Sequence, residues 1–297
     1  MELASFPYQK LMQRWSLLIS LILFISYNAF SQVIIPGKFI DKRYPLFNDS
    51  RIADQAIESI TIRVMRKPSS RPIYDDGRRI AYHFNELGRL ISFQKVFPSR
   101  AGRVDTSSQT FIYRNDIIQA RSEKIGKYRK RISLDHISTH QVIETIKVKH
   151  GNMDWDELGK EEIKRNESKI EDQLLITELR GGVNEAPYQS TISVFNANNK
   201  PIKKEVWYSS RLASLEQYEY SNGLLSSYSI KNAEKGSTMN ISYSTSSSIQ
   251  DEGTWCENDE CKNWSIVFYE TGLPKAFILM NIKTQDMEIW EYRYKYR

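Results

Sequence analysis

The sequence contains little of the chemistry that marks common enzymes and small secreted scaffolds. Its 297 residues include two cysteines and four histidines. Two thiols exclude a disulfide-dense scaffold and a zinc site built from four thiolates. The motifs GxGxxG, GxxxxGK[ST], HExxH and GxSxG are all absent, so the common nucleotide-binding, zinc-protease and hydrolase signatures are missing. The sequence therefore favours a non-catalytic protein over an enzyme, and it predicts no cofactor.

The few histidines do not form a recognisable metal site. His136 and His140 are spaced i,i+4, which would place two imidazoles on one face of a helix. The surrounding segment lacks helical periodicity, and no carboxylate stands at a signature spacing. We therefore interpret both as polar loop residues and predict no metal.

The composition is that of a globular protein. Hydrophobic residues make up 40%, charged residues 26% and aromatic residues 12%, with a mean hydropathy of −0.53. The chain is too aromatic for a disordered protein and too polar for a polytopic membrane protein. Its net charge is +6.

The N-terminus has the features of an export signal. Lys10 and Arg14 precede an apolar run over residues 15–27, and Ala29 and Ser31 are small residues at the −3 and −1 positions of a cleavage site. The alternative is a transmembrane anchor, but the run is shorter than the roughly 20 apolar residues that a bilayer requires. We expect a signal peptide over residues 1–31 and a mature chain, 32–297, without a transmembrane anchor.

The ending Ala29-Phe30-Ser31-Gln32 resembles signal peptides of Bacteroidota. That resemblance implies an exported protein, either periplasmic or at the cell surface or beyond it. Export also permits a disulfide. Cys256 and Cys261 are separated by four residues, a spacing that can close a hairpin. We expect a disulfide; the alternatives are two free thiols or half of a metal site.

Most of the mature chain predicts strands. Along Met287–Tyr296, Trp290, Tyr292 and Tyr294 share one face, as in a sheet with one packed side. Helical patterns are confined to Ile52–Ile60 and Trp155–Ile170, and the second fits a short helix or a solvated loop equally well. The prediction is an all-β domain over 32–297 with little helix and a helical or loop insertion near 151–172.

A degenerate repeat organises these strands. Five stretches share a strand ending in an aromatic residue, a short turn closed by Gly, Asn or Asp, and a second strand with Leu, Ile or Pro two residues on. Those turn residues adopt positive φ at least cost. The pattern predicts successive antiparallel hairpins that form an extended or curled meander. The five turns are 85–88, 114–116, 196–199, 221–223 and 270–272.

The first copy carries a family resemblance. Phe84-Asn85-Glu86-Leu87-Gly88-Arg89-Leu90 resembles the YD repeat of Rhs-type proteins, and Tyr74-Asp75-Asp76-Gly77-Arg78 is similar to a shortened copy. MORN-like repeat proteins of bacteria have a similar pattern of strand, short turn and strand. The resemblance implies antiparallel sheets that carry or bind another molecule, and it implies no particular activity.

A basic run is the strongest charge feature. Six cations and one tyrosine fall within eleven residues. Basic residues beside an aromatic could follow a nucleic-acid backbone, but export argues against nucleic acid. Anionic lipid headgroups or an acidic polysaccharide fit better, and the alternative is a solvated edge strand whose cations block edge pairing. The residues are Arg121, Lys124, Lys127, Tyr128, Arg129, Lys130 and Arg131.

Aromatic strands offer a second candidate surface. Tyr218, Tyr220, Trp290 and Tyr292 could stack against sugar rings, although packing within the sheet is the favoured use. The function predicted is a non-catalytic binding or structural module of the cell envelope, with glycan, lipid or protein as partner. The alternatives are a hydrolase of envelope polymers with a carboxylate-based site, and a periplasmic carrier of lipid or lipoprotein whose sheet closes around an apolar interior.

Overall fold

The computed structural model describes residues 49–98, 104–115, 117–221, 224–233, 236–242, 244–247, 250–258 and 260–297. The predicted signal peptide lies outside these residues. The chain divides into two compact units, and every helix and strand of the described residues belongs to the second, Phe47–Arg297. Its elements in chain order are α2 (Asp49–Asp54), β1 (Ile57–Lys67), β2 (Tyr74–Phe84), β3 (Leu90–Pro98), β4 (Val104–Arg114), β5 (Ile117–Ile125), β6 (Tyr128–Ser138), β7 (Gln141–His150), β8 (Asp156–Ile170), β9 (Gln173–Gly182), β10 (Pro187–Phe195), β11 (Pro201–Tyr208), β12 (Arg211–Ser221), β13 (Leu224–Asn232), β14 (Ser237–Ser242), β15 (Ser244–Ser247), β16 (Gln250–Glu257), β17 (Glu260–Phe268), β18 (Pro274–Asn281) and β19 (Met287–Tyr296).

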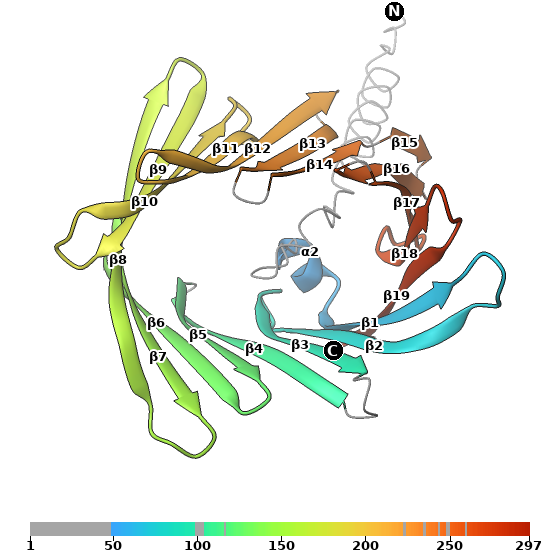
Figure 1. Ribbon diagram of the computed structural model, residues 1–297, viewed down its shortest axis with the longest axis horizontal. Helices are drawn as coiled ribbons and strands as arrows, with labels where there is room; N and C mark the ends of the chain where they lie inside the picture. Colours follow the sequence, from blue (N-terminus) through green and yellow to red (C-terminus); the bar gives the residue numbers. More distant parts are fainter. Residues whose placement is uncertain are drawn as a thin grey trace, which may run out of the picture. The chain divides into compact units, whose positions relative to one another are not determined.

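The strands form one antiparallel sheet that closes on itself. Consecutive strands pair along the chain, and β19 pairs with β1. β14 and β15 both pair with β16 in one register, since Ile241 faces Trp255 and Ser244 faces Glu252. They occupy one position, so the unit is an 18-strand barrel built as a meander (Figure 1). The prediction of an all-β antiparallel meander is confirmed. The structure shows in addition that the meander closes into a barrel.

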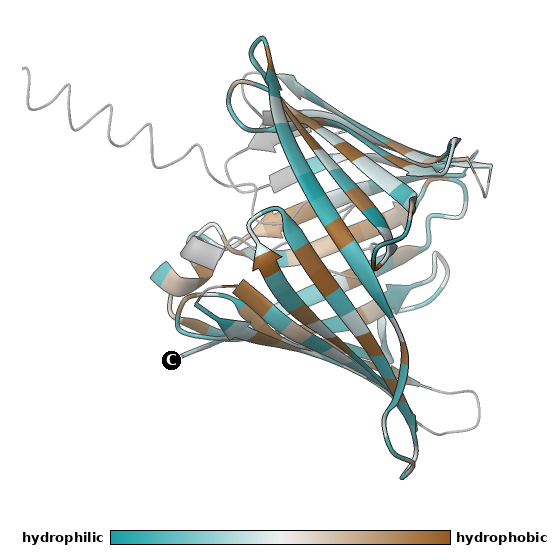
Figure 2. Ribbon diagram, turned by 90° about the vertical axis from the view of Figure 1, so that its left-hand side faces the viewer, coloured by the Kyte–Doolittle hydropathy of each residue, from teal (hydrophilic) through white to brown (hydrophobic). Residues whose placement is uncertain are grey.

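Hairpins alternate between the two ends of the barrel. α2 leads into β1, and the backbone N–H of Arg297 donates to the carbonyl oxygen of Ala56 (2.9 Å). We call this the α2 end; β2–β3, β4–β5, β10–β11, β12–β13 and β17–β18 turn here. The β1–β2, β5–β6 and β7–β8 connections lie at the opposite end. Figure 2 shows α2 and the C-terminus on the same side of the barrel. No described helix is both long and apolar enough to cross a membrane.

The five turns expected from the sequence all connect adjacent strands at the α2 end. Gly88, Asn115, Asn199 and Gly272 have positive φ, between 48° and 77°, and the tip of the fourth turn lies outside the described residues. In every one of the five hairpins the pairing register shifts beside the aromatic residue that ends the first strand, as at Phe84 and Tyr113. The repeat therefore specifies a bulged, tight hairpin.

A tyrosine on a nearby strand fastens three of these turns. The hydroxyl of Tyr113 donates to the carbonyl oxygen of Leu90 (2.9 Å), that of Tyr220 to Pro201 (2.8 Å), and that of Tyr294 to Pro274 (2.6 Å). Each acceptor stands two residues after the residue that closes its turn. The backbone carbonyl oxygen of the recurring Leu or Pro thus accepts a hydrogen bond from a tyrosine of a neighbouring hairpin.

The resemblance to YD-repeat and MORN-like proteins was wrong. The hairpins join a single barrel that closes through the β1–β19 pairing, and they do not build an extended or shell-like repeat array. The second proposed copy is not a turn either. Tyr74 to Arg78 lie within β2, where Gly77 takes a φ of +80° inside the strand. The motif encodes local turn geometry, which unrelated folds share.

The helical or loop insertion expected near 151–172 was also wrong, because most of it is the 15-residue strand β8. β8 pairs with β7 and β9 over much of its length. Both faces of the strand carry charge, which removed the alternation of apolar and polar residues. Ion pairs to neighbouring strands, such as Lys147 with Glu157 (3.7 Å), connect β8 to the sheet where alternating apolar side chains are missing.

Candidate binding interior

The two faces of the barrel wall differ in burial. An outer side chain of a single-layer ring has no second layer above it, so large, fully buried side chains must face inward. Ile62 has 0% exposure, and its register neighbours Ile80 and Tyr292 are also buried. Because side chains alternate along each strand, these residues fix the inner face of every strand through the register. Figure 2 shows the alternation of apolar and polar residues along the strands.

One part of the inner face is mostly apolar, although Lys95 and Gln109 interrupt it on β3 and β4. We call it the apolar arc: the inward side chains of β12–β19 and β1–β4. Tyr218 faces Tyr228 across β12 and β13 with ring centroids 5.0 Å apart, and Tyr82 lies the same distance from Phe93. Ile52 of α2 is buried, and α2 contacts β1. Further inward members are Ile60, Val64, Phe111, Ile241, Trp264, Ile266, Phe277 and Trp290.

The remaining inner face is mixed and carries charge. We call it the polar arc: the inward side chains of β5–β11. At its centre, Arg180 lies 3.1 Å from Glu144 and 2.6 Å from Glu161, and the hydroxyl of Tyr188 donates to Glu161 (2.8 Å). Ile146 and Ile163 beside this cluster are only half-buried. Inner apolar side chains thus stay accessible next to an ion-pair cluster.

A second polar group stands where the two arcs meet. The hydroxyls of Tyr218 and Tyr228 donate to Glu216 (2.6 and 3.2 Å), and Lys204 pairs with the same carboxylate (3.3 Å). Burial, and then the charge of Glu216, raise the pKa of Tyr218. Burial opposes the charge of Arg180, but Glu144 and Glu161 outweigh it and raise its pKa. The guanidinium of Arg180 therefore stays charged inside the barrel at neutral pH.

The outer face is polar over several strands. Its residues on β6 and β7 include four cations toward the end opposite α2, and those on β13 and β14 are mostly hydroxyls and amides. Apolar side chains gather on other outward stretches, with Leu175, Ile192 and Val194 on β9 and β10 and Ile278, Met280 and Ile289 on β18 and β19. Outward members include Arg129, Arg131, Lys147, Lys149, Lys203, Glu205, Ser227, Ser229, Lys231, Thr238 and Asn240.

The basic run of the sequence is divided between the two faces. It covers the second half of β5, the β5–β6 turn and the first four residues of β6, at the end opposite α2. Lys124, Arg129 and Arg131 face outward, Arg121, Tyr128 and Lys130 have the inward register, and Lys127 stands in the turn. The alternative of a solvated edge strand was wrong, because β5 and β6 are each paired on both sides.

The four candidate aromatic residues do not form an outer stacking surface. Tyr218 and Tyr292 are buried on the inner face, and Tyr220 and Trp290 are half-buried there. The indole N–H of Trp290 donates to Glu288 (2.6 Å), and its ring meets Phe277 edge-on at 5.8 Å. The structure thus brings these residues into the wall of the apolar arc.

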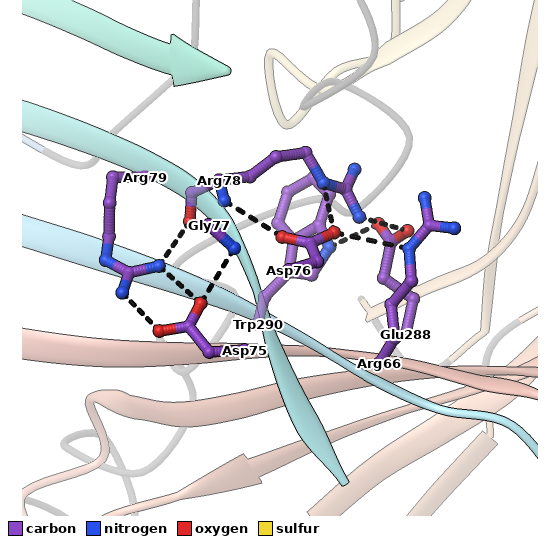
Figure 3. A network of polar contacts seen from close by, with 8 residues as sticks. All are labelled: Arg66, Asp75, Asp76, Gly77, Arg78, Arg79, Glu288 and Trp290. Carbon is purple, nitrogen blue, oxygen red and sulfur yellow. Dashed lines mark hydrogen bonds and ion pairs between the residues drawn. The ribbon is translucent and has the colours of Figure 1, made fainter. Parts of the chain in front are cut away.

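A charged network connects adjacent strands toward the end of the barrel opposite α2 (Figure 3). Asp76 pairs with Arg66 and Arg78, and Arg78 reaches Glu288 (2.7 Å). Asp75 binds Arg79, the backbone N–H of Gly77 (2.9 Å) and Arg63 (3.0 Å). The bonds from Arg79, Gly77 and Arg63, in that order, lower the pKa of Asp75. Each carboxylate is paired, so the network joins β1, β2 and β19.

Cys256 and Cys261 form a disulfide between facing positions of β16 and β17, with an S–S distance of 2.06 Å. His136 and His140 lie near the β6–β7 turn, where His136 Nε2 contacts the carbonyl oxygen of Ile118 (3.0 Å). No group of three or more His, Cys, Asp and Glu side chains suited to a metal ion occurs in the described residues.

Comparison with known proteins does not place the chain in a family. No protein-family model matches it, and no curated protein does. A porin-like protein from Bacteroides uniformis ATCC 8492 aligns over 81% of this chain and 97% of its own, at 9% identity and a TM-score of 0.33. LolA superfamily protein NE2245 from Nitrosomonas europaea aligns over 91% of each chain, at 10% identity and a TM-score of 0.22. Scores this low assign neither fold nor function, so the barrel rests on its strand pairing.

Sequence reasoning missed the polar arc. Glu144, Glu161 and Arg180 come from three strands and lie 17 to 36 positions apart in the chain, without a motif. The available signal was the charge along β8, which was interpreted as a helical or loop insertion near 151–172. Only the register shows that these charges share the inner face.

Proposed function

We propose that this protein is a non-catalytic carrier of the cell envelope that holds an amphipathic, lipid-like molecule inside its barrel. One observation carries the proposal: the inner face is mostly apolar over one arc and carries charge on the other, while long stretches of the outer face are polar. An acyl chain would lie along the apolar arc, and a polar head would lie against the ion-pair clusters around Arg180 and Glu216.

The number of strands supports an interior large enough for a ligand. Barrel diameter grows with strand number, and barrels of 16–18 strands enclose more space than their own inward side chains fill. Ile146, Val148 and Ile163 on the inner face are half-buried, although they are apolar and belong to a closed wall. They are the side chains that a ligand would cover.

The polar stretches of the outer face support a barrel surrounded by water. A barrel embedded in a bilayer presents an apolar band about 25 Å tall to the lipid. Here Lys160, Lys164 and Glu205 occupy outward positions away from the ends of β8 and β11, where burial in lipid would be costly. With the export signal predicted at residues 1–31, this favours a periplasmic or extracellular location.

The alternative of a carboxylate-based hydrolase has less support. The two acidic residues that converge on the inner face, Glu144 and Glu161, both contact the guanidinium of Arg180. Each carboxylate is thus engaged by a cation, which suits a fixed polar wall better than a proton donor that must meet a substrate. A glycan or a protein as ligand of the interior would not need the apolar arc.

Binding of a fluorescent fatty acid tests the proposal. The purified protein is titrated with cis-parinaric acid, and its organic extract is examined by mass spectrometry for lipids acquired during expression. Ile146→Gln places an amide on the inner face and is expected to weaken binding roughly tenfold, the scale expected when a buried apolar contact is lost. Ile143→Gln, on the same strand but facing outward and also half-buried, is the matched control.

Equal affinity of the two variants would contradict the proposal, as would absence of saturable binding by the wild-type protein. Because both substitutions replace isoleucine with glutamine three residues apart on β7, a general loss of stability would affect both variants. Circular dichroism and the urea midpoint of each variant separate such a loss from a specific effect on the interior.

A further inference from the structure

Two neighbouring hairpins at the end opposite α2 expose a group of large apolar side chains. The β5–β6 and β7–β8 turns are joined by a hydrogen bond from the backbone N–H of Gly151 to the carbonyl oxygen of Lys127 (3.0 Å). Met153 is 64% exposed and Leu158 66%. We call this group the β5–β8 tip. Its apolar members are Ile125, Tyr128, Met153, Trp155 and Leu158.

Cations stand directly behind these apolar residues. In the outward register, Lys124 faces Arg129, Arg129 faces Lys149, and Arg131 faces Lys147. Like charges in facing positions of a sheet destabilise it. Lys147 pairs with Glu157, but Lys124, Lys127, Arg129, Arg131 and Lys149 have no ion pair within the described part of the chain. Asp154 and Asp156 flank Trp155 and compensate only part of this charge.

We propose that the β5–β8 tip docks the barrel on an anionic lipid bilayer. Tryptophan and tyrosine favour the boundary between headgroups and acyl chains, and exposed aliphatic side chains beside lysine and arginine are typical of surfaces that bind membranes peripherally. The apolar side chains of the tip would enter that boundary. The outward cations of β5–β7 would lie against the headgroups and relieve their mutual repulsion.

The combination of side chains favours lipid over an acidic polysaccharide. A polyanion in water would meet the cations but would leave Met153 and Leu158 exposed to solvent. Exposed apolar residues also occur elsewhere on the barrel. Ile137 and Ile170, at the α2 end, are 57% and 60% exposed, and Lys169 is the lone cation within three residues of either. The inference concerns where the protein binds, and it holds whether or not the interior carries a lipid.

Vesicle co-sedimentation of the full chain tests this assignment. Vesicles of phosphatidylcholine are compared with vesicles that also contain phosphatidylglycerol. We expect binding to the anionic vesicles, weakened by added salt. Two variants, Met153→Ser/Trp155→Ser/Leu158→Ser and Lys124→Gln/Arg129→Gln/Lys149→Gln, should each reduce binding at least about tenfold. The control, Ile137→Ser/Ile170→Ser, removes equally exposed apolar residues from the other end and should bind as the wild type does.

Quenching by brominated phosphatidylglycerol locates the contact. Trp155 should account for most of the quenched fluorescence, measured as the difference between the wild type and Trp155→Phe. All changed side chains of the tip are exposed or half-exposed, and circular dichroism checks that the variants fold. The assignment is overturned if the tip variants bind like the wild type, or if the control loses binding equally. It is also overturned if the protein binds heparin but not anionic vesicles.

Discussion

A single glycine shows how tightly the wall is fitted on its inner face. Gly253 of β16 faces Trp264 of β17. A Cβ at this position would lie 1.8 Å from the carbonyl oxygen of Ser242 and 2.7 Å from Cζ2 of Trp264. The indole ring thus covers the space left by the missing side chain, a recognised way of stabilising glycine in a sheet. The backbone of β14 passes too close for any other residue.

Gly253→Ala should therefore destabilise the barrel by about 1–3 kcal/mol, the cost of an added methyl group in a tightly packed site. The free energy of unfolding in urea measures the effect. Gly159→Ala on β8 is the control, because no heavy atom lies within 4 Å of its added Cβ. Similar losses for the two variants would show that the tight contact at Gly253 does not determine stability.

The pH dependence of stability should depend on Asp75. Bonds from Arg79, Gly77 and Arg63 lower its pKa below the ordinary value of 3.8, so its contribution is present above that pH and is lost as the pH falls further. The difference in unfolding free energy between the wild type and Asp75→Asn should be largest at neutral pH and should shrink below pH 3.8. Asp135→Asn, at an exposed aspartate without an ion pair in the described residues, is the control for the loss of one carboxylate.

At the scale of elements, the hairpins of the α2 end depend on tyrosine hydroxyls. Tyr294→Phe removes the bond to the carbonyl oxygen of Pro274 and should cost about 0.5–1.5 kcal/mol, the usual net value of one hydrogen bond. Thermal unfolding is a sufficient measurement. Tyr208→Phe, at an exposed residue of β11 at the opposite end, should leave the midpoint unchanged. A loss of equal size there would contradict the fastening role.

The hairpins were also the part of the fold that the sequence could predict. Asn199, Gly88 and Gly272 favour positive φ by their own chemistry, so the turn is specified within a few residues. β8 could not be found in this way, because Lys160, Glu161 and Glu162 place charge on both of its faces. Its strand state depends on partners in β7 and β9, which lie in other parts of the chain.

At the scale of the whole molecule, the sequence could predict neither that the sheet closes into a barrel nor which face of each strand points inward. The β1–β19 pairing joins Ile62 to Tyr292, 230 positions apart, and no local pattern encodes it. The alternation along β19 predicted that Trp290, Tyr292 and Tyr294 share a face, but an open meander and a barrel place that face differently. The candidate aromatic site became an inner wall for this reason.

Ile62 at the closing strands offers a test of the barrel as a whole. Ile62→Ala should lower the free energy of unfolding by about 2–5 kcal/mol, since the side chain has 0% exposure between β19 and β2. Ile112→Ala, at an exposed outward position of β4, should change it by less than about 0.5 kcal/mol. If the two changes were equal in urea titrations, the closing pairing would not form in solution.

The hydrogen bond between Arg297 and Ala56 has a consequence for protein engineering. A short peptide linker could connect these two positions, and a new start could be introduced at a surface turn between any two strands. Such a circular permutant would retain every strand neighbour, because a meander that closes on itself has no preferred first strand. Moving the start to the β9–β10 turn would leave the order around the ring unchanged, and only the sequence in which the ribosome delivers the strands would differ.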